Sequence, residues 1–343
     1  MTDSFTPQFD TNQRPSILTW IKRHRSGLLL WGRLIIAFAL MAFVVSLVLR
    51  DQDKLRSVNW TLIPFAWLLM LVSTAIKAYR WGLLIHQSHM DLPFRRLLGS
   101  YLVGAFFSTV LPTSVGGDAV RAVDTAASTG RVADSTSSVL IERGIGLLSV
   151  IGAGSLFALF LESGQVPLAF VLMIHALFVA GIVVLIVLRQ GWFMGPIAAL
   201  MRRVRLGKYV SKVNHLQAAF SSHLKQPGVL GAMLLLSIAA NALTMGATYL
   251  VLVAVTNPIG VGAFVPMIAL TTAAELIPIS PASLGVKESA YVFFLGLAGV
   301  GSGSAGVIAI IMRGLTWGHA LLGGLVFLSR TVQSTQDEAT PVP

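Results

Sequence analysis

The strongest constraint on this chain is a set of six apolar runs, each long enough for a helix to cross a lipid bilayer. A crossing takes about 20 apolar residues, because an α-helix rises about 1.5 Å per residue through a hydrocarbon core about 30 Å thick. Lipid satisfies no backbone N–H or C=O group, so helices and closed barrels are the structures that span it. The sequence therefore predicts an all-α polytopic membrane protein. The runs cover about residues 32–49, 60–76, 144–161, 167–188, 229–255 and 305–328.

The composition fits this class and excludes several others. Hydrophobic residues make up 55% of the chain and charged residues 11%, and no stretch outside the apolar runs is long enough for a soluble catalytic domain. The net charge of +11 does not indicate a nucleic-acid partner, since the basic residues flank the apolar runs. There is no cysteine, which excludes disulfides and thiol nucleophiles. His86 and His89, three residues apart, do not by themselves make a metal site, so we expect no metal and no cofactor.

The distribution of basic residues predicts the orientation. Of the 25 lysines and arginines, 19 fall in segments placed on the inner side, and seven of these lie in the loop 189–228. The positive-inside rule then places both termini in the cytoplasm, in a bacterial-type cytoplasmic (inner) membrane. Within the loop, residues 206–225 predict a basic amphipathic helix, either on the inner leaflet or packed on the end of the bundle. The predicted domains are a basic tail, a membrane domain and a polar tail, over 1–31, 32–328 and 329–343.

Two further apolar segments, about 97–122 and 263–299, are interrupted by proline, serine and glycine. An interruption at membrane depth is tolerated where protein or a water-filled cavity covers the backbone. Interrupted segments at matching places in two halves are typical of a transporter site near the midplane. The halves, about 60–161 and 229–328, then form an inverted repeat with two re-entrant hairpins. The alternative is a pair of ordinary loops with solvated charges. The interruptions contain Pro112, Ser114, Gly116, Gly117, Pro278, Ser280, Pro281 and Gly285.

Charged residues gather at the interruptions and in the helices that follow them. Ionisable groups inside a bilayer are costly, so they face cavities and pair with each other. Guanidinium groups match phosphate oxygens, and helices that restart after an interruption direct N-terminal N–H groups at the same place. We therefore expect a lipid phosphate to be bound by Arg121, Arg143, Arg313 and Lys287. The expected charge partners or proton carriers are Asp118, Glu142, Glu275 and Glu288.

These residues also have a purely structural interpretation. Asp118 and Arg121, three residues apart, suit an ion pair at the start of a helix near the interface. Arg313 suits an ion pair with Glu275 or Glu288 as well as it suits a ligand. On this interpretation the charges hold helices together and bind nothing.

Three stretches resemble one known family. PTSVGGDAVRA at 112–122, Glu142-Arg143, and PISPASLGVKES at 278–289 are similar to the membrane region of lysylphosphatidylglycerol synthases, which also occurs alone as the flippase-like UPF0104 family. The resemblance covers about residues 30–330 and implies lipid translocation. Some members carry an aminoacyl-transferase domain after this region. This chain ends at Pro343 without one, so by itself it is not expected to make lysyl-lipid.

The leading hypothesis is a lipid flippase that moves a phospholipid, an aminoacylated phospholipid, or a polyprenyl or hopanoid-related lipid. The alternative is a non-transporting accessory protein of envelope lipid biosynthesis. A third hypothesis is an integral membrane transferase with Asp118, Glu142 or Glu288 as general base, although no nucleotide motif accompanies them. We expect no enzymatic activity. The expected partners are anionic membrane lipids, a lipid-synthesis enzyme and further copies of the chain.

Overall fold

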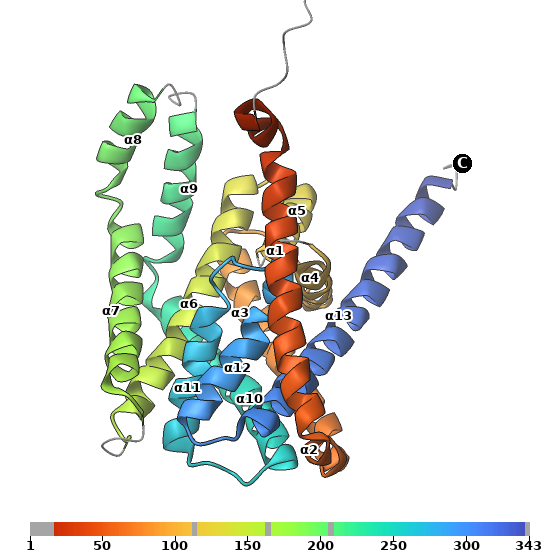
Figure 1. Cartoon of the computed structure of the whole chain (residues 1–343). Helices are drawn as coiled ribbons and strands as arrows, with labels where there is room; N and C mark the ends of the chain where they lie inside the picture. The colour runs from red at the N-terminus through yellow and green to blue at the C-terminus, as the bar shows by residue number, and fades with distance from the viewer. Residues whose placement is uncertain (1–16, 112–114, 162–165, 205–208, 340–343) are drawn as a thin grey trace, which may run out of the picture.

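The computed structural model describes residues 17–111, 115–161, 166–204 and 209–339, and within these ranges it contains helices and no strand. Six helices are long and apolar enough to cross a membrane. The chain is therefore an all-α polytopic membrane protein, as its apolar runs predict (Figure 1). These helices are α1 (Ile17–Arg50), α3 (Ile63–Gln87), α6 (Val132–Ala158), α7 (Leu168–Gln190), α10 (Pro227–Val255) and α13 (Ser302–Ala339).

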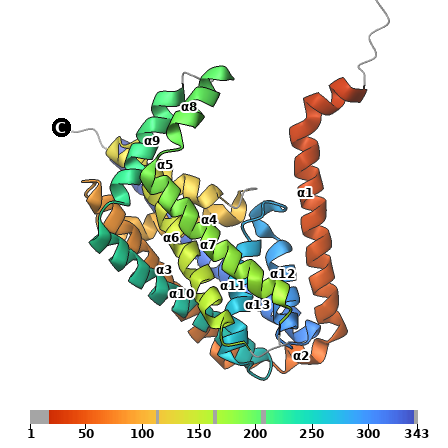
Figure 2. The ribbon, with the colours of Figure 1, turned by 90° about the vertical axis from the view of Figure 1, so that its left-hand side faces the viewer.

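Both ends of the described chain lie at the same end of the helix bundle, which we call the terminal end; the opposite end is the far end (Figure 1). α1 runs to the far end, where α2 (Gln52–Arg56) and the short helix η1 (Trp60–Leu62) lead into α3. α1 stands at the edge of the bundle (Figure 2) and exposes large apolar side chains such as Ile35, Phe38 and Phe43. An apolar outer surface of this kind suits contact with lipid.

The pair α3 and α10 shows that the two halves of the chain run in opposite directions. The two helices pack closely against each other. At the far end, the Asn59 N–H before α3 donates to the carbonyl of Ala254 near the end of α10, at 2.8 Å. At the terminal end, the Gln87 amide on α3 donates to the carbonyls of Ser222 and His223 just before α10, at 3.3 Å. The start of each helix therefore lies beside the end of the other.

Two shorter helical hairpins occupy the places of the predicted interrupted segments. The first consists of α4 (Phe94–Val110) and α5 (Gly116–Thr129), and the second of α11 (Val261–Ala274) and α12 (Val286–Leu297). The longest of these helices, α4, has 17 residues. Because 17 residues rise about 26 Å, none of the four spans a core about 30 Å thick by itself.

The hairpins enter the bundle from opposite ends. Arg131, just after α5, donates to the carbonyl of Ser88, which follows α3 at the terminal end. Ile259, just before α11, accepts from the Tyr249 hydroxyl at 3.0 Å near the far end. α4 packs on α13 of the other half, and α11 packs on α6. In an inverted repeat α4 corresponds to α11, and α13 corresponds to α6. The contact of α4 with α13 is therefore the counterpart of the contact of α11 with α6, as the predicted inverted repeat requires.

Several helices extend further than the apolar runs indicate. α3 continues past the end of its run, so Lys77 and Arg80 lie inside a spanning helix and not in a flanking loop. α6 begins before its run, so Glu142 and Arg143 also lie inside a helix. α1 and α13 continue into the predicted tails. For α3 and α6, the difference arises because ionised residues end an apolar run, whereas ion pairs stabilise Arg80, Glu142 and Arg143 within these helices.

The connection between α7 and α10 contains α8 (Met194–Arg203) and α9 (Val210–His223) at the terminal end (Figure 2). α9 packs on α6 and α7. Phe220 of α9 is buried in an apolar cluster with residues of α3, α6 and α10. His223 is buried as well, and burial lowers its pKa. Of the two interpretations of the helix predicted at 206–225, packing on the end of the bundle is therefore the one that the described part shows.

The largest apolar cluster joins the second hairpin to the spanning helices around it. Its members include Val251 on α10, Met267 on α11, Leu295 on α12 and Ile308 on α13, each at most 1% exposed. In lipid, such contacts stabilise the fold by close packing rather than by removal from water. The cluster holds the second hairpin in place, together with the charged residues at its tip.

Candidate functional site

The tips of the two hairpins share one cavity of about 320 Å³. Thr109 in the last turn of α4, Glu275 at the end of α11 and Lys287 in the first turn of α12 line it. The spanning helices α6 and α13 contribute Arg143 and Arg313. Residues from both halves of the chain therefore border the same space, as interrupted segments of a transporter do. Four of the eight charged residues predicted from the sequence line this main cavity.

Two acid–arginine pairs stand at equivalent places in the two halves. Asp118 is the third residue of α5 and pairs with Arg143 on the next helix, α6. Glu288 is the third residue of α12 and pairs with Arg313 on the next helix, α13. A carboxylate in the first turn of a helix also interacts favourably with the helix dipole. The repeat thus places one carboxylate and one guanidinium on each side of the main cavity.

The two arginines differ in exposure. The Arg143 side chain is 32% exposed, whereas that of Arg313 is 8% exposed. Arg313 also donates to the carbonyl of Ser283 at 3.2 Å. The second oxygen of Glu288 accepts from the Gly285 N–H at 2.7 Å. The second pair is therefore tied to the backbone of its hairpin tip, while Arg143 is the arginine that an incoming ligand reaches more easily.

At the second interruption the backbone is left-handed at Ala282, Ser283 and Gly285, with φ of 50°, 53° and 78°. Residues with a side chain rarely adopt such angles, and each costs roughly 1–3 kcal/mol unless its surroundings hold it. α1 supplies that support, because a Cβ on Gly285 would lie 2.8 Å from the carbonyl oxygen of Ala37. The other predicted residues of this interruption lie between α11 and α12, in the turn after α11 and in the short helix η3 (Pro281–Ser283). They are Pro278, Ser280 and Pro281.

The first interruption relies on a close approach of α5 to α4. A Cβ on Gly117 would meet the carbonyl of Gly104 and the hydroxyl of Ser108, both on α4. Gly116, the first residue of α5, is buried as well. Glycine allows this approach, which brings Asp118 in the same turn toward α6. Two predicted residues of this interruption lie outside the described residues: Pro112 and Ser114.

A third ion pair lines the main cavity itself. The Lys287 Nζ lies 3.0 Å from the Glu275 Oε1, and the two side chains are 21% and 28% exposed. Glu288, by contrast, is almost fully buried by its arginine and by the tip backbone. Of the two carboxylates predicted as proton carriers in the second half, Glu275 is therefore the one in contact with the main cavity.

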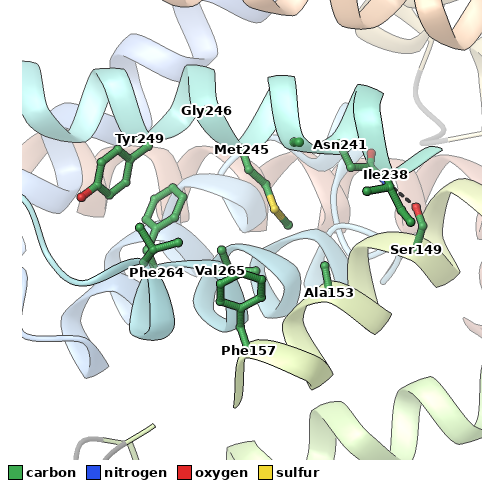
Figure 3. Close-up of a pocket in the computed structure, with 12 residues that line it drawn as sticks. Ser149, Ala153, Phe157, Ile238, Asn241, Met245, Gly246, Tyr249, Phe264 and Val265 are labelled. Atoms are coloured by element: carbon green, nitrogen blue, oxygen red, sulfur yellow. Dashed lines mark hydrogen bonds between the residues drawn. The ribbon is translucent and has the colours of Figure 1, made fainter. Parts of the chain in front are cut away.

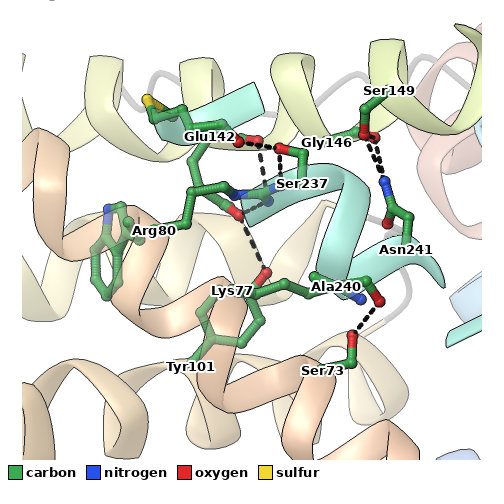
Figure 4. A network of polar contacts seen from close by, with 12 residues as sticks. Ser73, Lys77, Arg80, Tyr101, Glu142, Gly146, Ser149, Ser237, Ala240 and Asn241 are labelled. Atoms are coloured by element: carbon green, nitrogen blue, oxygen red, sulfur yellow. Dashed lines mark hydrogen bonds and ion pairs between the residues drawn. The ribbon is translucent and has the colours of Figure 1, made fainter. Parts of the chain in front are cut away.

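Next to the first acid–arginine pair, a buried cluster joins α3, α5 and α6. Glu142 pairs with Arg80 through one oxygen, and its other oxygen accepts from both terminal nitrogens of Arg121 at 3.3 Å. Arg80 also donates to the hydroxyl of Ser237 on α10 (Figure 4). The three charged side chains are at most 4% exposed. Glu142 therefore contacts two buried guanidinium groups at once.

Arg121 does not line the main cavity. Its guanidinium carbon lies 4.3 Å from the centre of the Trp81 ring and 4.0 Å from that of Tyr101. Stacking against aromatic rings stabilises a cation that is cut off from water. Arg121 also lies 3.4 Å from Asp118, as the sequence spacing suggests. Arg121 therefore stabilises the first turn of α5 and lies outside the main cavity.

Sequence reasoning missed Arg80 and Tyr101 as members of this region and treated Lys77 as a flanking charge. The signal for the two cations is the stretch AYRWGLLI at 78–85, which remains mostly apolar after Lys77. Reading it as a continuation of the helix would have placed both at membrane depth. Tyr101 gives no such signal, because an aromatic residue in an apolar run is typical of any spanning helix.

A second cavity, of about 360 Å³, is apolar and lies between α6, α10 and α11 (Figure 3). Phe157, Met245 and Phe264 line it. Its polar lining includes Asn241, whose amide donates to the Ser149 hydroxyl at 2.6 Å. No charged side chain of the described residues borders it. This apolar cavity therefore offers no site for a headgroup.

The fold and the site define a class of protein: a polytopic helical membrane protein whose two inverted halves each bring a short hairpin and an acid–arginine pair to one cavity. The family model of the lysylphosphatidylglycerol synthase TM region matches residues 26–324, so this chain belongs to that family. The resemblance seen in the sequence is thus confirmed. Family membership supports a role connected with membrane lipids.

A UPF0104 membrane protein of Methanothermobacter thermautotrophicus is 22% identical over 307 residues, which cover 82% of this chain and 90% of the relative. No solved structure matches the chain. The arrangement of the halves and of the charged residues described above therefore comes from the structure of this chain itself.

Proposed function

We propose that this protein is a lipid flippase that moves a phosphate-bearing lipid between the two leaflets of the membrane. The observation that carries the proposal is the presence of two equivalent acid–arginine pairs whose arginines line one cavity between the hairpin tips. The headgroup enters the main cavity, and the acyl chains stay in the surrounding lipid. The substrate is a phospholipid, an aminoacylated phospholipid, or a polyprenyl or hopanoid-related lipid.

The phosphate is held by Arg143, Arg313 and Lys287, which all line the main cavity. Guanidinium groups bind phosphate oxygens through two parallel hydrogen bonds, and an ammonium adds a point charge. Without a ligand each cation needs a carboxylate, because an unpaired ion at membrane depth costs about 2.5–3.5 kcal/mol on insertion scales. When phosphate binds Lys287, Glu275 loses its ion-pair partner. Glu275 is therefore the carboxylate that we propose as the proton carrier if a proton gradient drives transport.

Alternating access follows from the inverted repeat. The hairpins enter from opposite ends and meet at the main cavity, so each half closes the cavity toward one side of the membrane. Rocking of one half against the other then opens the cavity to each leaflet in turn. Both arginines stay close to the headgroup throughout, because each belongs to a helix of a different half.

We propose that both termini lie in the cytoplasm, with the protein in the inner membrane of a bacterial-type cell. The loop 189–228 contains seven lysines and arginines, and α8 and α9 within it lie at the terminal end. The partners that we propose are the membrane lipids and, at the terminal end, an enzyme that makes or uses the transported lipid. The proposal contains no enzymatic step.

The test is lipid translocation in proteoliposomes with fluorescent phosphatidylglycerol, lysyl-phosphatidylglycerol, phosphatidylcholine and a prenyl phosphate. We expect headgroup-selective flipping above the protein-free background. Neutralising the first acid–arginine pair as a whole, with Asp118→Asn and Arg143→Gln together, avoids leaving a lone charge behind. It is expected to slow flipping about tenfold or more, as the loss of a charge-assisted hydrogen bond worth about 1.5–3 kcal/mol implies.

The matched control is a pair at the terminal end, Arg131 and Asp134, which are joined at 2.9 Å and have side chains 43% and 23% exposed. Arg131→Gln with Asp134→Asn is expected to flip lipid at the wild-type rate. Equal rates for wild type and the Asp118/Arg143 double variant contradict the assigned site. If no lipid of the panel is flipped above background, the accessory role in envelope lipid biosynthesis replaces the transporter.

A further inference from the structure

A small polar cavity of about 100 Å³ adjoins the main cavity. Thr74 and Lys77 on α3, Thr244 on α10 and His319 on α13 line it. Ala105 on α4 and Thr316 on α13 line both cavities, so the two spaces share a wall. Arg313, Thr316 and His319 follow one another at intervals of three residues and so lie on one face of α13. That face leads from the main cavity to the small one.

Among the lysines and arginines that line the two cavities, Lys77 is the one without a carboxylate partner in the described residues. Its Nζ donates to the Thr244 hydroxyl at 3.3 Å, and within the described residues no carboxylate lies at ion-pair distance from it. Arg143, Arg313 and Lys287, which line the main cavity, each have a carboxylate partner. An ammonium inside a spanning helix is costly unless something offsets its charge. The small cavity is the space from which a ligand would offset it.

His319 adds a polar atom without a hydrogen-bond partner. Its Nε2 lies 2.9 Å from the Thr74 hydroxyl, and its Nδ1 is buried and makes no hydrogen bond with the described residues. The side chain is nearly fully buried, so an unused polar atom here carries a real cost. The small cavity thus combines an ammonium without a carboxylate partner and a Thr74–His319 pair with one unused polar atom.

The equivalent place in the other half shows that the fold does not require these polar residues. Exchange of the halves maps α3, α4 and α13 onto α10, α11 and α6, which enclose the apolar cavity of Figure 3. Ser149 there stands six residues after Arg143, as His319 stands six residues after Arg313. The polar lining of the apolar cavity includes the neutral Ser149 and Asn241, whereas the small cavity has the cationic Lys77 and the ring of His319. Only one of the two equivalent places is built for an anion.

We propose that the small cavity is a second anion-binding subsite. The Lys77 ammonium and the one donor that the Thr74–His319 pair leaves unused hold one anionic group, while the arginines of the main cavity hold another. This inference rests on the proposed function and narrows its substrate to lipids whose headgroup carries two anionic groups, of which a diphosphate is the simplest. A headgroup with two adjacent anionic groups can engage both spaces, because Ala105 and Thr316 line both cavities.

Calorimetric titration of the protein in phosphatidylcholine nanodiscs tests this subsite, with inorganic phosphate and inorganic pyrophosphate as the ligands. Wild type is expected to bind pyrophosphate about tenfold more tightly than phosphate, since a second charge-assisted contact forms. Lys77→Met keeps the length of the side chain and removes its charge, so it is expected to lose this preference and still bind phosphate like wild type. Lys54→Met, at an exposed lysine of α2, is the matched control and is expected to keep the preference.

The inference and the proposed function fail in different ways. If Lys77→Met keeps the preference for pyrophosphate, the second subsite is wrong while the main cavity stands. If the Asp118/Arg143 double variant binds phosphate as wild type does, the headgroup site itself is wrong. Farnesyl phosphate and farnesyl diphosphate form a second arm, in which the diphosphate preference is expected to persist with tighter binding of both. If the farnesyl compounds bind no more tightly than inorganic phosphate and pyrophosphate, the ligand is a soluble anion, and the proposal of a lipid substrate is wrong.

Discussion

Replacing Glu142 with glutamine is expected to remove most of the folded protein. The substitution keeps the shape of the side chain but leaves Arg80 without any carboxylate and Arg121 with Asp118 alone. Breaking a buried ion pair by removing one partner costs about 3–5 kcal/mol, because the other charge stays buried and unpaired. Total stabilities of folded domains are roughly 5–15 kcal/mol, so such a loss is a large part of the whole.

Size-exclusion chromatography in mild detergent and the midpoint of thermal unfolding measure this loss. Asp124→Asn is the matched control, because Asp124 pairs with Arg96 and Arg330 through side chains that are about a third or more exposed. Exposed pairs contribute about 0–1 kcal/mol, so the control is expected to unfold close to the wild-type temperature. A Glu142→Gln protein as stable as Asp124→Asn shows that the cluster does not hold α3, α5 and α6 together.

The second acid–arginine pair is expected to show strong coupling. Glu288→Gln alone leaves Arg313 buried without a carboxylate, and Arg313→Gln alone leaves Glu288 buried without a cation. Each single change is expected to cost about 3–5 kcal/mol, whereas the double change removes both charges and recovers much of that loss. The glutamine at 288 still presents an oxygen to the Gly285 N–H, so the hairpin tip keeps its hydrogen bond.

Thermal unfolding of the four proteins of this cycle measures the coupling, and the translocation assay is run on the double variant. We expect a folded double variant that flips lipid about tenfold or more slowly than wild type, because the phosphate has lost a guanidinium partner. A double variant as unstable as the single ones means that the pair is not a coupled unit. A folded double variant with wild-type flipping removes Arg313 from the headgroup site.

The sequence predicts those parts of the fold that depend on short, continuous sequence patterns. Apolar runs of bilayer length mark the six spanning helices, and the proline and glycine interruptions mark the two hairpin tips. A charge directly after each interruption marks Asp118 and Glu288 as members of a site. These marks depend on a few neighbouring residues and not on how distant segments pack.

What the sequence could not predict depends on those distant contacts. Arg121 and Arg143 have similar sequence contexts. In the structure, however, Arg121 on α5 stacks against two aromatic rings, whereas Arg143 on α6 lines the main cavity. Arg80 sits within an extension of an apolar run and is paired by a carboxylate 62 residues away. The small cavity joins Lys77 to His319 across α3 and α13, and no local pattern predicts that meeting.

The central claim is that the lipid headgroup passes through the main cavity, and a single cysteine tests it most directly because the chain has none of its own. Thr109→Cys places a thiol in the cavity wall, and Ser128→Cys places one on the same hairpin at its exposed open end. Both variants are reconstituted, treated with a bulky thiol reagent and assayed for lipid translocation. The account predicts that modification stops flipping by Thr109→Cys and leaves Ser128→Cys unaffected. A fully modified Thr109→Cys protein that flips lipid at its unmodified rate would contradict it.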